Sequence, residues 1–304
     1  MTRVFRSPRL LHITVFVFLF PIVLRPCDSC GGQTGAALGL MPNVSGHFLG
    51  LRARTTQQKT METSTLNRDQ TITTDRFSSI EWVGRHQFNA RWQLWAFVPY
   101  QQHVKQRSNQ TEIIEGLGDA SLQGWYTAIQ PKLEDRRVKH SLLAGMGLHI
   151  PTGKHMKRDE RKVLYPAPFQ LGTGAFRFSV MMLYSAAIGK GGVFANAMLR
   201  THQENELAYQ FGAIRQHLVG SYMRFAFGSY QLIASAGWLA EQNLSNRQFG
   251  NSVPSTAGQA SFAQLGFELS KNKWSASLQL APALSYNGSQ APGTRLALGW
   301  VWAF

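Results

Sequence analysis

The residue pair with the most reactive chemistry is Cys27 and Cys30, the only cysteines of the chain, in the stretch RPCDSCGG. Two thiols at this spacing form a disulfide in an oxidising compartment or bind a soft metal ion. A structural zinc site needs four ligands, and no second CxxC or spaced histidine pair follows. A disulfide and a metal-handling role both stay open, and both require that the two cysteines remain in the mature chain.

Histidine and serine could form a nucleophilic site, but catalysis needs a base, a nucleophile and an orienting group that converge. No sequence pattern joins a serine to any of the histidines. Five of the histidines are scattered along the chain after its first hundred residues: His103, His149, His155, His202 and His217. We therefore expect neither an enzyme nor a bound cofactor.

A third set of polar residues falls within segments of alternating hydrophobicity. Residues two apart on a strand share a face, so these side chains would point away from the apolar face. The set comprises Glu81, Arg85, Asp119, Lys139, Arg177 and Arg200. Two interpretations remain: an ion-pair network that fills and rigidifies an interior, or a charged constriction that selects solutes.

The elements that would hold these residues alternate with a period of two. In WSASLQL (274–280), Trp274, Ala276, Leu278 and Leu280 lie on one face, and serines and a glutamine lie on the other. In a soluble sandwich the second face would be rich in charge, yet charged residues make up only 15% of this chain. Small polar side chains instead suit the hydrated interior of a membrane barrel.

Twelve such segments are expected, and several are near the length of about ten residues that spans a bilayer when a strand tilts. Their connections alternate between long and short, which is typical of an up-and-down barrel. The sequence therefore predicts an all-β, antiparallel transmembrane barrel of about 12 strands, of the outer-membrane type. The expected segments are 46–54, 76–88, 90–101, 117–129, 138–150, 170–188, 192–202, 208–225, 230–242, 259–270, 273–286 and 294–304.

The chain ends on RLALGWVWAF, where Trp300, Trp302 and Phe304 share one parity. An exposed aromatic ladder at the end of a soluble domain would be an aggregation site, so something must cover it. We expect lipid to cover it, with the aromatic residues in the interfacial belt. The pattern is similar to the carboxy-terminal signature of outer-membrane barrels, which implies recognition by the barrel-assembly machinery.

The first 26 residues have a basic start and a short apolar run from Ile13 to Leu24, as secretory signal peptides do. We expect residues 1–26 to be a signal peptide, 27–45 a periplasmic segment or small plug, and 46–304 the barrel. The formal charge of +15 falls to about +11 without the four signal arginines. Export argues against nucleic acid as a partner, and the phosphates of lipopolysaccharide in a Gram-negative outer membrane complement this charge.

Three motifs carry a family resemblance: RWQLWAFVPYQQ (91–102), GLGDASLQGWY (116–126) and GLHIPTGK (147–154). They resemble the outer-membrane barrels named for the MetA pathway of phenol degradation, relatives of the FadL-type hydrocarbon transporters. The resemblance implies a channel or transporter for small, hydrophobic or aromatic solutes. The alternative function is a non-transporting structural or metal-handling barrel that uses Cys27 and Cys30.

Overall fold

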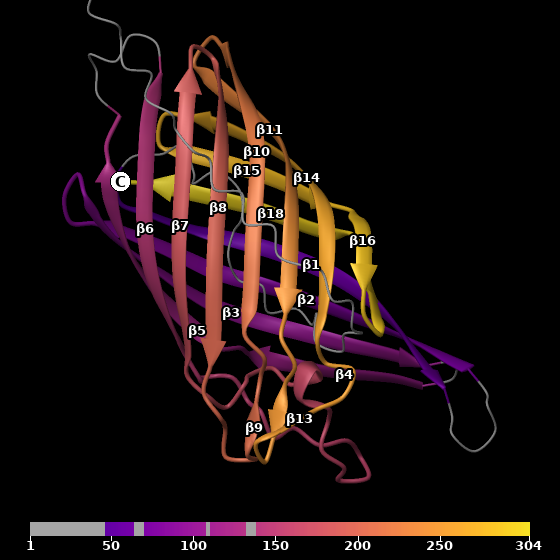
Figure 1. Ribbon diagram of the computed structural model, residues 1–304. Helices are drawn as coiled ribbons and strands as arrows, with labels where there is room; N and C mark the ends of the chain where they lie inside the picture. The colour runs from indigo at the N-terminus through magenta and orange to yellow at the C-terminus, as the bar shows by residue number, and fades with distance from the viewer. Residues whose placement is uncertain (1–45, 64–69, 108–109, 132–137) are drawn as a thin grey trace, which may run out of the picture.

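The computed structural model describes residues 46–63, 70–107, 110–131 and 138–304, and these fold into one closed antiparallel barrel (Figure 1). Each strand of the ring pairs with the ring strand before it, and β18 pairs with β1 to close the ring. This confirms the predicted twelve-stranded barrel. The ring strands are β1 (Phe48–Thr63), β2 (Gln70–Gln87), β3 (Trp92–Arg107), β5 (Ala120–Ile129), β6 (Lys139–Ile150), β7 (Arg177–Ile188), β8 (Gly191–His202), β10 (Ile214–Phe227), β11 (Tyr230–Asn243), β14 (Gly258–Lys271), β15 (Trp274–Ala281) and β18 (Arg295–Ala303).

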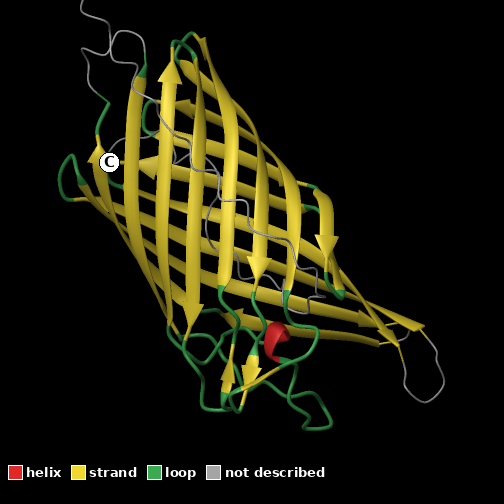
Figure 2. Ribbon diagram, viewed as in Figure 1, coloured by secondary structure: helices red, strands yellow, loops and turns green. Residues whose placement is uncertain are grey.

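The remaining elements extend the ring or lie beyond it (Figure 2). Three short strands lengthen ring hairpins: β4 (Gln110–Leu117), β16 (Ala283–Asn287) and β17 (Gln290–Pro292). A separate small sheet consists of β9 (Tyr209–Gln210), β12 (Arg247–Gln248) and β13 (Asn251–Ser252). A 3-10 turn, η1, spans Ala167–Phe169, and no helix in the described part of the chain has the length and apolar character to cross a membrane.

The two ends of the barrel differ in their connections. At one end, which we call the turn end, two residues join β7 to β8, β10 to β11 and β14 to β15. Gly189, Gly228 and Asn272 begin these turns with positive φ angles, which glycine and asparagine tolerate in tight hairpins. At the other end, the loop end, residues 151–176, 203–213 and 244–257 form long connections, and the C-terminus lies at the turn end (Figure 1).

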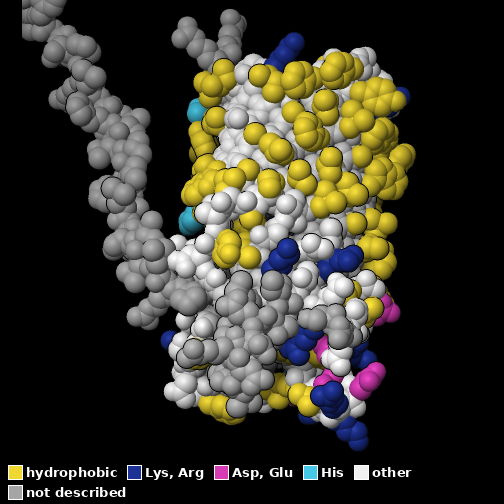
Figure 3. Space-filling model, turned by 90° about the vertical axis from the view of Figure 1, so that its right-hand side faces the viewer, with side chains coloured by type: hydrophobic (Ala, Val, Ile, Leu, Met, Phe, Trp, Pro, Cys, Tyr) yellow, Lys and Arg dark blue, Asp and Glu magenta, His cyan; other side chains and the backbone are white. Residues whose placement is uncertain are grey.

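The outer face of the barrel is apolar on the parity that the sequence predicts. Figure 3 shows hydrophobic side chains covering the part of the surface near the turn end, with lysine and arginine nearer the loop end. Hydrophobic residues exposed on this face include Leu49, Leu51, Ile80, Trp82, Leu122, Phe178, Val180, Val219, Trp238, Phe267, Leu298 and Trp300. Exposed apolar area on this scale requires a covering of lipid or protein.

Several segment boundaries differ from the prediction. The loops expected at 55–75 and 102–116 are largely strand. β1 extends as far as Thr63 and β2 already begins at Gln70, so these two strands form one long hairpin, and β3 and β4 form a second. In TTQQKT (55–60) both faces are polar, so the hydrophobic alternation is lost, although the backbone of β1 still pairs with that of β2 here. The expected segment 273–286 breaks at Pro282, which has no N–H to donate to a ladder.

Two strands begin later than expected, and for the first of them the reason is burial inside the barrel. The segments predicted from 170 and 208 begin as β7 at Arg177 and β10 at Ile214. Residues 170–176 carry apolar side chains such as Leu171 and Ala175, which are buried. A hydrophobic pattern alone does not distinguish an apolar residue packed inside the barrel from one that faces lipid.

Ring closure brings β1 and β18 very close at Gly50, which pairs with Val301. A Cβ atom added at Gly50 would lie 2.6 Å from Cγ1 of Val301 and would also meet the carbonyl oxygen of Trp300. A Cβ atom added at Gly124 on β5 would have no atom within 4 Å apart from those of its own residue and its two chain neighbours. The closing seam therefore requires a residue without a side chain at position 50, whereas position 124 of β5 does not.

We expect the Gly50→Ala variant to lose about 1–3 kcal/mol of stability through overpacking at the seam. Denaturant titration of the refolded barrel, followed by its heat-dependent mobility on gels, measures this loss. The matched Gly124→Ala variant should change stability by no more than about 0.5 kcal/mol. Equal stabilities for the two variants would contradict a tight seam.

Candidate functional site

The barrel interior receives most of the charged residues predicted to face inward. Glu81, Arg85, Asp119, Arg177 and Arg200 are all buried, and Arg200 has no exposed surface. Lys139 does not lie with them. It has the inward parity of β6 but sits at the turn end of that strand, where its side chain is exposed.

Asp119 joins the long 151–176 loop to the barrel wall. Its carboxylate accepts hydrogen bonds from the backbone N–H groups of Gly153 and Thr173, each at 3.0 Å, and from the Thr173 hydroxyl at 2.8 Å. A guanidinium nitrogen of Arg177 lies 3.2 Å from the same carboxylate. Four donors thus converge on one buried carboxylate, which is a strong arrangement because the acceptor is charged.

The three motifs behind the family resemblance meet at this place. The N–H of Gly118 donates to the carbonyl oxygen of Pro99 at 2.9 Å, so the first two motifs touch. The hydroxyl of Thr152 donates to the carbonyl of Gly118 at 2.8 Å and accepts from the N–H of Ala120 at 2.9 Å, which adds the third. The motifs therefore build a structural junction, which we call the loop clasp, around Asp119.

The clasped loop fills part of the barrel mouth at the loop end. Phe169 and Leu171 are buried against Phe77 of β2 and Ile114 of β4, both of which face inward. Nδ1 of His103 lies 2.8 Å from the carbonyl oxygen of Phe169 and donates to it. The loop end is accordingly narrower than a ring of twelve strands alone would make it.

An arginine cluster occupies the middle of the lumen. Glu81 accepts a 2.9 Å hydrogen bond from Nε of Arg52 and forms an ion pair with Arg54. Arg295 of β18 donates twice to Glu241 of β11, at 3.1 and 3.3 Å, across the two strands that separate them in the ring.

Electrostatic coupling extends this cluster further around the ring. Arg54 experiences repulsion from Arg52, Arg200 and Arg295, and Glu241 attracts both Arg200 and Arg295. The amide of Gln216 adds a 2.6 Å hydrogen bond to Glu241. We call Arg52, Arg54, Arg200 and Arg295, with Glu81 and Glu241, the arginine cluster.

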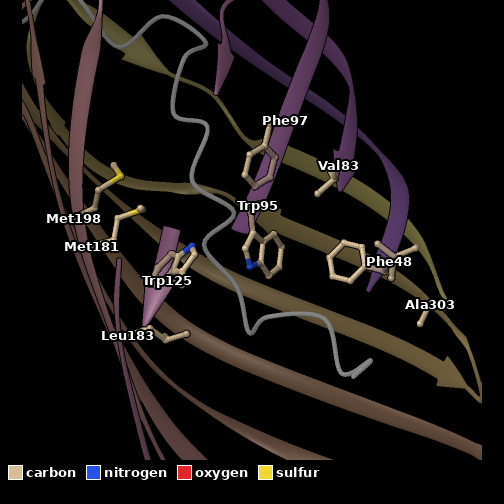
Figure 4. Packing of buried hydrophobic residues seen from close by; sticks show 10 residues of the cluster. Phe48, Val83, Trp95, Phe97, Trp125, Met181, Leu183, Met198 and Ala303 are labelled. Carbon is tan, nitrogen blue, oxygen red and sulfur yellow. The ribbon is translucent and has the colours of Figure 1, made fainter. Parts of the chain in front are cut away.

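An apolar compartment lies on the turn-end side of the arginine cluster, and its buried hydrophobic side chains are drawn in Figure 4. Phe48 and Trp95 meet edge to face with ring centroids 5.2 Å apart, and Trp95 stacks with Phe97 at 6.1 Å. Val83 and Val301 are buried in the same cluster. Figure 4 shows Phe48, Val83, Trp95 and Phe97 projecting from their strands into the barrel interior.

Two adjoining cavities follow this division of the lumen. The first, of about 100 Å³, is lined by three residues of the arginine cluster and by Phe77, Gln101 and His103. The second, of about 90 Å³, is lined by Phe48, Val83, Trp95, Phe97, Ile233, Glu268 and Val301 among others. Arg52, Gln264, Gln279 and Ala297 line both cavities and so mark the junction between them.

Sequence reasoning missed Arg52, Arg54, Glu241 and Arg295 as site residues, although the signal was present. Arg52 and Arg54 alternate with the outward residues Leu49 and Leu51, so their parity places them inside. What the sequence lacks is any indication that Arg295 and Glu241, 54 residues apart, form an ion pair inside the barrel.

The other predicted site residues are placed as follows. Trp300, Trp302 and Phe304 are exposed on the outer face at the end of the closing strand. Cys27 and Cys30 lie outside the described residues. Among the residues that the structure describes, no three His, Cys, Asp or Glu side chains gather in a way that could hold a metal ion.

Several solved structures are similar to this chain. An outer membrane channel from Pseudomonas putida F1 matches with a TM-score of 0.66 and 14% identity over 86% of this chain and 96% of that chain. The autotransporter NalP translocator domain from Neisseria meningitidis gives 0.46 at 14% identity, over 86% and 90% of the two chains. A FadL homologue from Pseudomonas aeruginosa gives 0.43 at 10% identity, over 93% and 99%.

No protein-family model and no curated protein sequence matches the chain. At 14% identity, the likeness to the Pseudomonas putida channel shows a shared fold. Fold and lumen together define an outer-membrane type of β-barrel with a polar, charged interior and an apolar outer face. The predicted fold class is thereby confirmed.

We expect the Asp119→Asn variant to release the 151–176 loop, because an amide offers one acceptor oxygen where four donors now share two. Losing charge-assisted hydrogen bonds of this kind costs about 1.5–3 kcal/mol each. Trypsin cleavage within the basic stretch 154–162 should therefore become roughly tenfold faster or more in the folded barrel.

The matched control is Glu115→Gln on the outer face, where the carboxylate accepts one exposed hydrogen bond from Gln102. This variant should leave the cleavage rate unchanged. If Asp119→Asn is cleaved no faster than Glu115→Gln, the carboxylate does not hold the loop.

Proposed function

We propose that the protein is an outer-membrane channel or transporter for small, hydrophobic or aromatic solutes. The observation that carries the proposal is the pair of adjoining cavities inside the barrel, one of them lined by Phe48, Trp95 and Phe97. A structural barrel does not need an aromatic compartment next to a charged one within its lumen. A passage for a small apolar solute needs such an aromatic compartment, because the faces of aromatic rings offer the solute a large apolar contact area.

The barrel size supports selective passage over an open water channel. Twelve strands enclose more space than an eight-stranded barrel, whose interior is filled by side chains, and less than a porin of sixteen strands. In this barrel the loop clasp and the arginine cluster occupy much of that space. The shared fold with an outer membrane channel and the three family motifs are consistent with the same function.

We further propose that residues 1–26 direct export and that the barrel resides in the outer membrane of a Gram-negative bacterium. The apolar outer face would contact lipid, and basic residues near the loop end would contact lipopolysaccharide phosphates. Trp300, Trp302 and Phe304 would serve the assembly machinery and then lie in the interfacial belt.

Uptake of phenol-like solutes by whole cells tests the proposed function directly, because an intact lipopolysaccharide leaflet slows their passage through lipid. We expect a strain without the gene to take up such solutes more slowly than the complemented strain. Equal uptake across a broad panel of solutes would contradict the proposal.

A single substitution should block the passage. Ser277 lines the aromatic cavity from β15, and its neighbour Ala276 has the outward parity. We expect Ser277→Trp to fill the cavity and reduce uptake to that of the deletion strain, whereas Ala276→Trp should add an aromatic residue facing lipid and leave uptake unchanged. Heat-dependent gel mobility verifies that both variants fold. Equal uptake by the two variants would mean that solutes do not use this cavity.

The proposed assembly signal gives a separate prediction. Phe304 is exposed, and its N–H donates to the carbonyl of His47 at 3.1 Å, so the backbone contact survives a change of side chain. We expect Phe304→Ala to lower the amount of folded barrel in the outer membrane several-fold, while Phe227→Ala, which removes an equally exposed phenylalanine at the turn end, should not. Similar amounts of both variants would argue against a terminal recognition signal.

A further inference from the structure

We propose that the lumen holds a binding site for a small aromatic carboxylate. Its carboxylate would contact Arg52 at the junction of the two cavities, and its ring would occupy the aromatic cavity. The inference rests on the proposed function and narrows it, since it assigns a negative charge to the solute. It depends on three features: the charge balance of the arginine cluster, the position of Arg52 and the orientation of the cavity.

The charge balance favours an anion. Four guanidinium groups of the cluster share the carboxylates of Glu81 and Glu241 within the described part of the lumen. Each arginine contributes one positive charge, so the cluster has more positive than negative charge in a site shielded from bulk water. A solute with one carboxylate lowers this repulsion, and a cationic solute raises it.

The position of Arg52 connects this charge to the aromatic cavity. Arg52 lines both cavities, and its guanidinium lies over the Phe97 ring at 5.3 Å from the centroid. Glu81 binds its Nε and one terminal nitrogen, which fixes the plane of the group. The guanidinium carries five N–H donors, so two contacts to Glu81 leave donors that can reach a second carboxylate.

Arg295 is held in a similar way on β18, the strand that pairs with β1. Its guanidinium lies 3.9 Å from the centroid of Phe262 and pairs with Glu241. Cation–π stacking and a carboxylate partner keep each of these long side chains in one orientation, so little rotamer entropy remains to be lost on binding. The site is therefore largely formed before any ligand enters.

The aromatic cavity gives the ligand an orientation. Glu268 lines this cavity too, where its carboxylate accepts a 2.6 Å hydrogen bond from the Ser275 hydroxyl. A ligand carboxylate would be repelled by Glu268 and attracted by Arg52, so the ring points away from the arginine cluster. Phe48, Trp95 and Phe97 then surround the ring.

Size limits the ligand to a small molecule. An apolar cavity of about 150 Å³ is known to bind benzene. The two cavities measure about 100 and 90 Å³ and adjoin at Arg52, so their combined space is of that order. One aromatic ring with a carboxylate fits this space, with the polar group on the arginine side.

Fluorine NMR titration of the full-length barrel in detergent tests the inference. The probes are 4-fluorobenzoate and 4-fluorobenzyl alcohol, which match in shape and differ in charge, with empty micelles as the reference for partitioning. We expect 4-fluorobenzoate to bind more tightly than the alcohol. Arg52→Gln should weaken 4-fluorobenzoate about tenfold, as the loss of a charge-assisted hydrogen bond does, and change the alcohol by no more than about twofold.

Two further variants separate a direct contact from a general effect. Arg52→Lys keeps the positive charge and should retain part of the affinity. Arg224→Gln removes a lumen-facing arginine near the turn end that donates to Tyr222 and lines neither cavity, so it should leave both probes unaffected. Glu81 keeps Arg54 as a partner in the Arg52 variants, which protects the fold.

The outcomes distinguish this inference from the proposed function. Equal affinity for the two probes, with no effect of Arg52→Gln, overturns the carboxylate site while apolar solutes could still pass. Equal weakening by Arg52→Gln and Arg224→Gln also overturns it, because only net charge would then matter. Absence of binding by either probe overturns the site as well, and the cellular uptake experiment decides separately whether the barrel transports apolar solutes.

Discussion

Hydrogen bonding of the backbone in hydrocarbon is the constraint on which this molecule depends. Water is absent from the bilayer core, so every N–H and C=O at that depth needs a partner within the protein. The ring meets this demand only because β18 returns to β1 and pairs with it from Phe48 to Thr55. Gly50 permits the close approach at this seam, and a ring closed there has no free edge in lipid.

Closure also divides the side chains into two populations with different environments. Alternation places Leu49 and Leu51 outside and Arg52 and Arg54 inside, within six consecutive positions of one strand. Burying four arginines would be very costly without partners, and Glu81 and Glu241 offset much of that cost. The pair of Arg295 and Glu241 does more, because it connects β18 with β11 across the two strands that lie between them in the ring.

A feature can be predicted from the sequence when it depends on residues that are close together in the chain, and not when it depends on residues that are far apart. The strands and their faces could be predicted because hydrophobic alternation is local, as in WSASLQL (274–280), where β15 has its predicted face. The long β1–β2 hairpin could not, since outside hydrocarbon its polar strands lack that signal. Nor could the loop clasp, because Asp119 binds Gly153 and Thr173, which are 34 and 54 residues away. The inward charges at 81, 85, 119, 177 and 200 followed from parity, whereas Lys139 shows that parity does not tell how far from the rim a residue lies.

The loop clasp and the arginine cluster belong to one continuous electrostatic system. Arg177 binds Asp119 at the clasp and also repels Arg200 of the cluster, while Arg200 is attracted to Glu241. Arg177 on β7 and Arg200 on β8 lie on paired strands, so the residue that anchors the 151–176 loop also borders the arginine cluster. Because these groups are shielded from bulk solvent, salt screens their interaction less than it would at a surface.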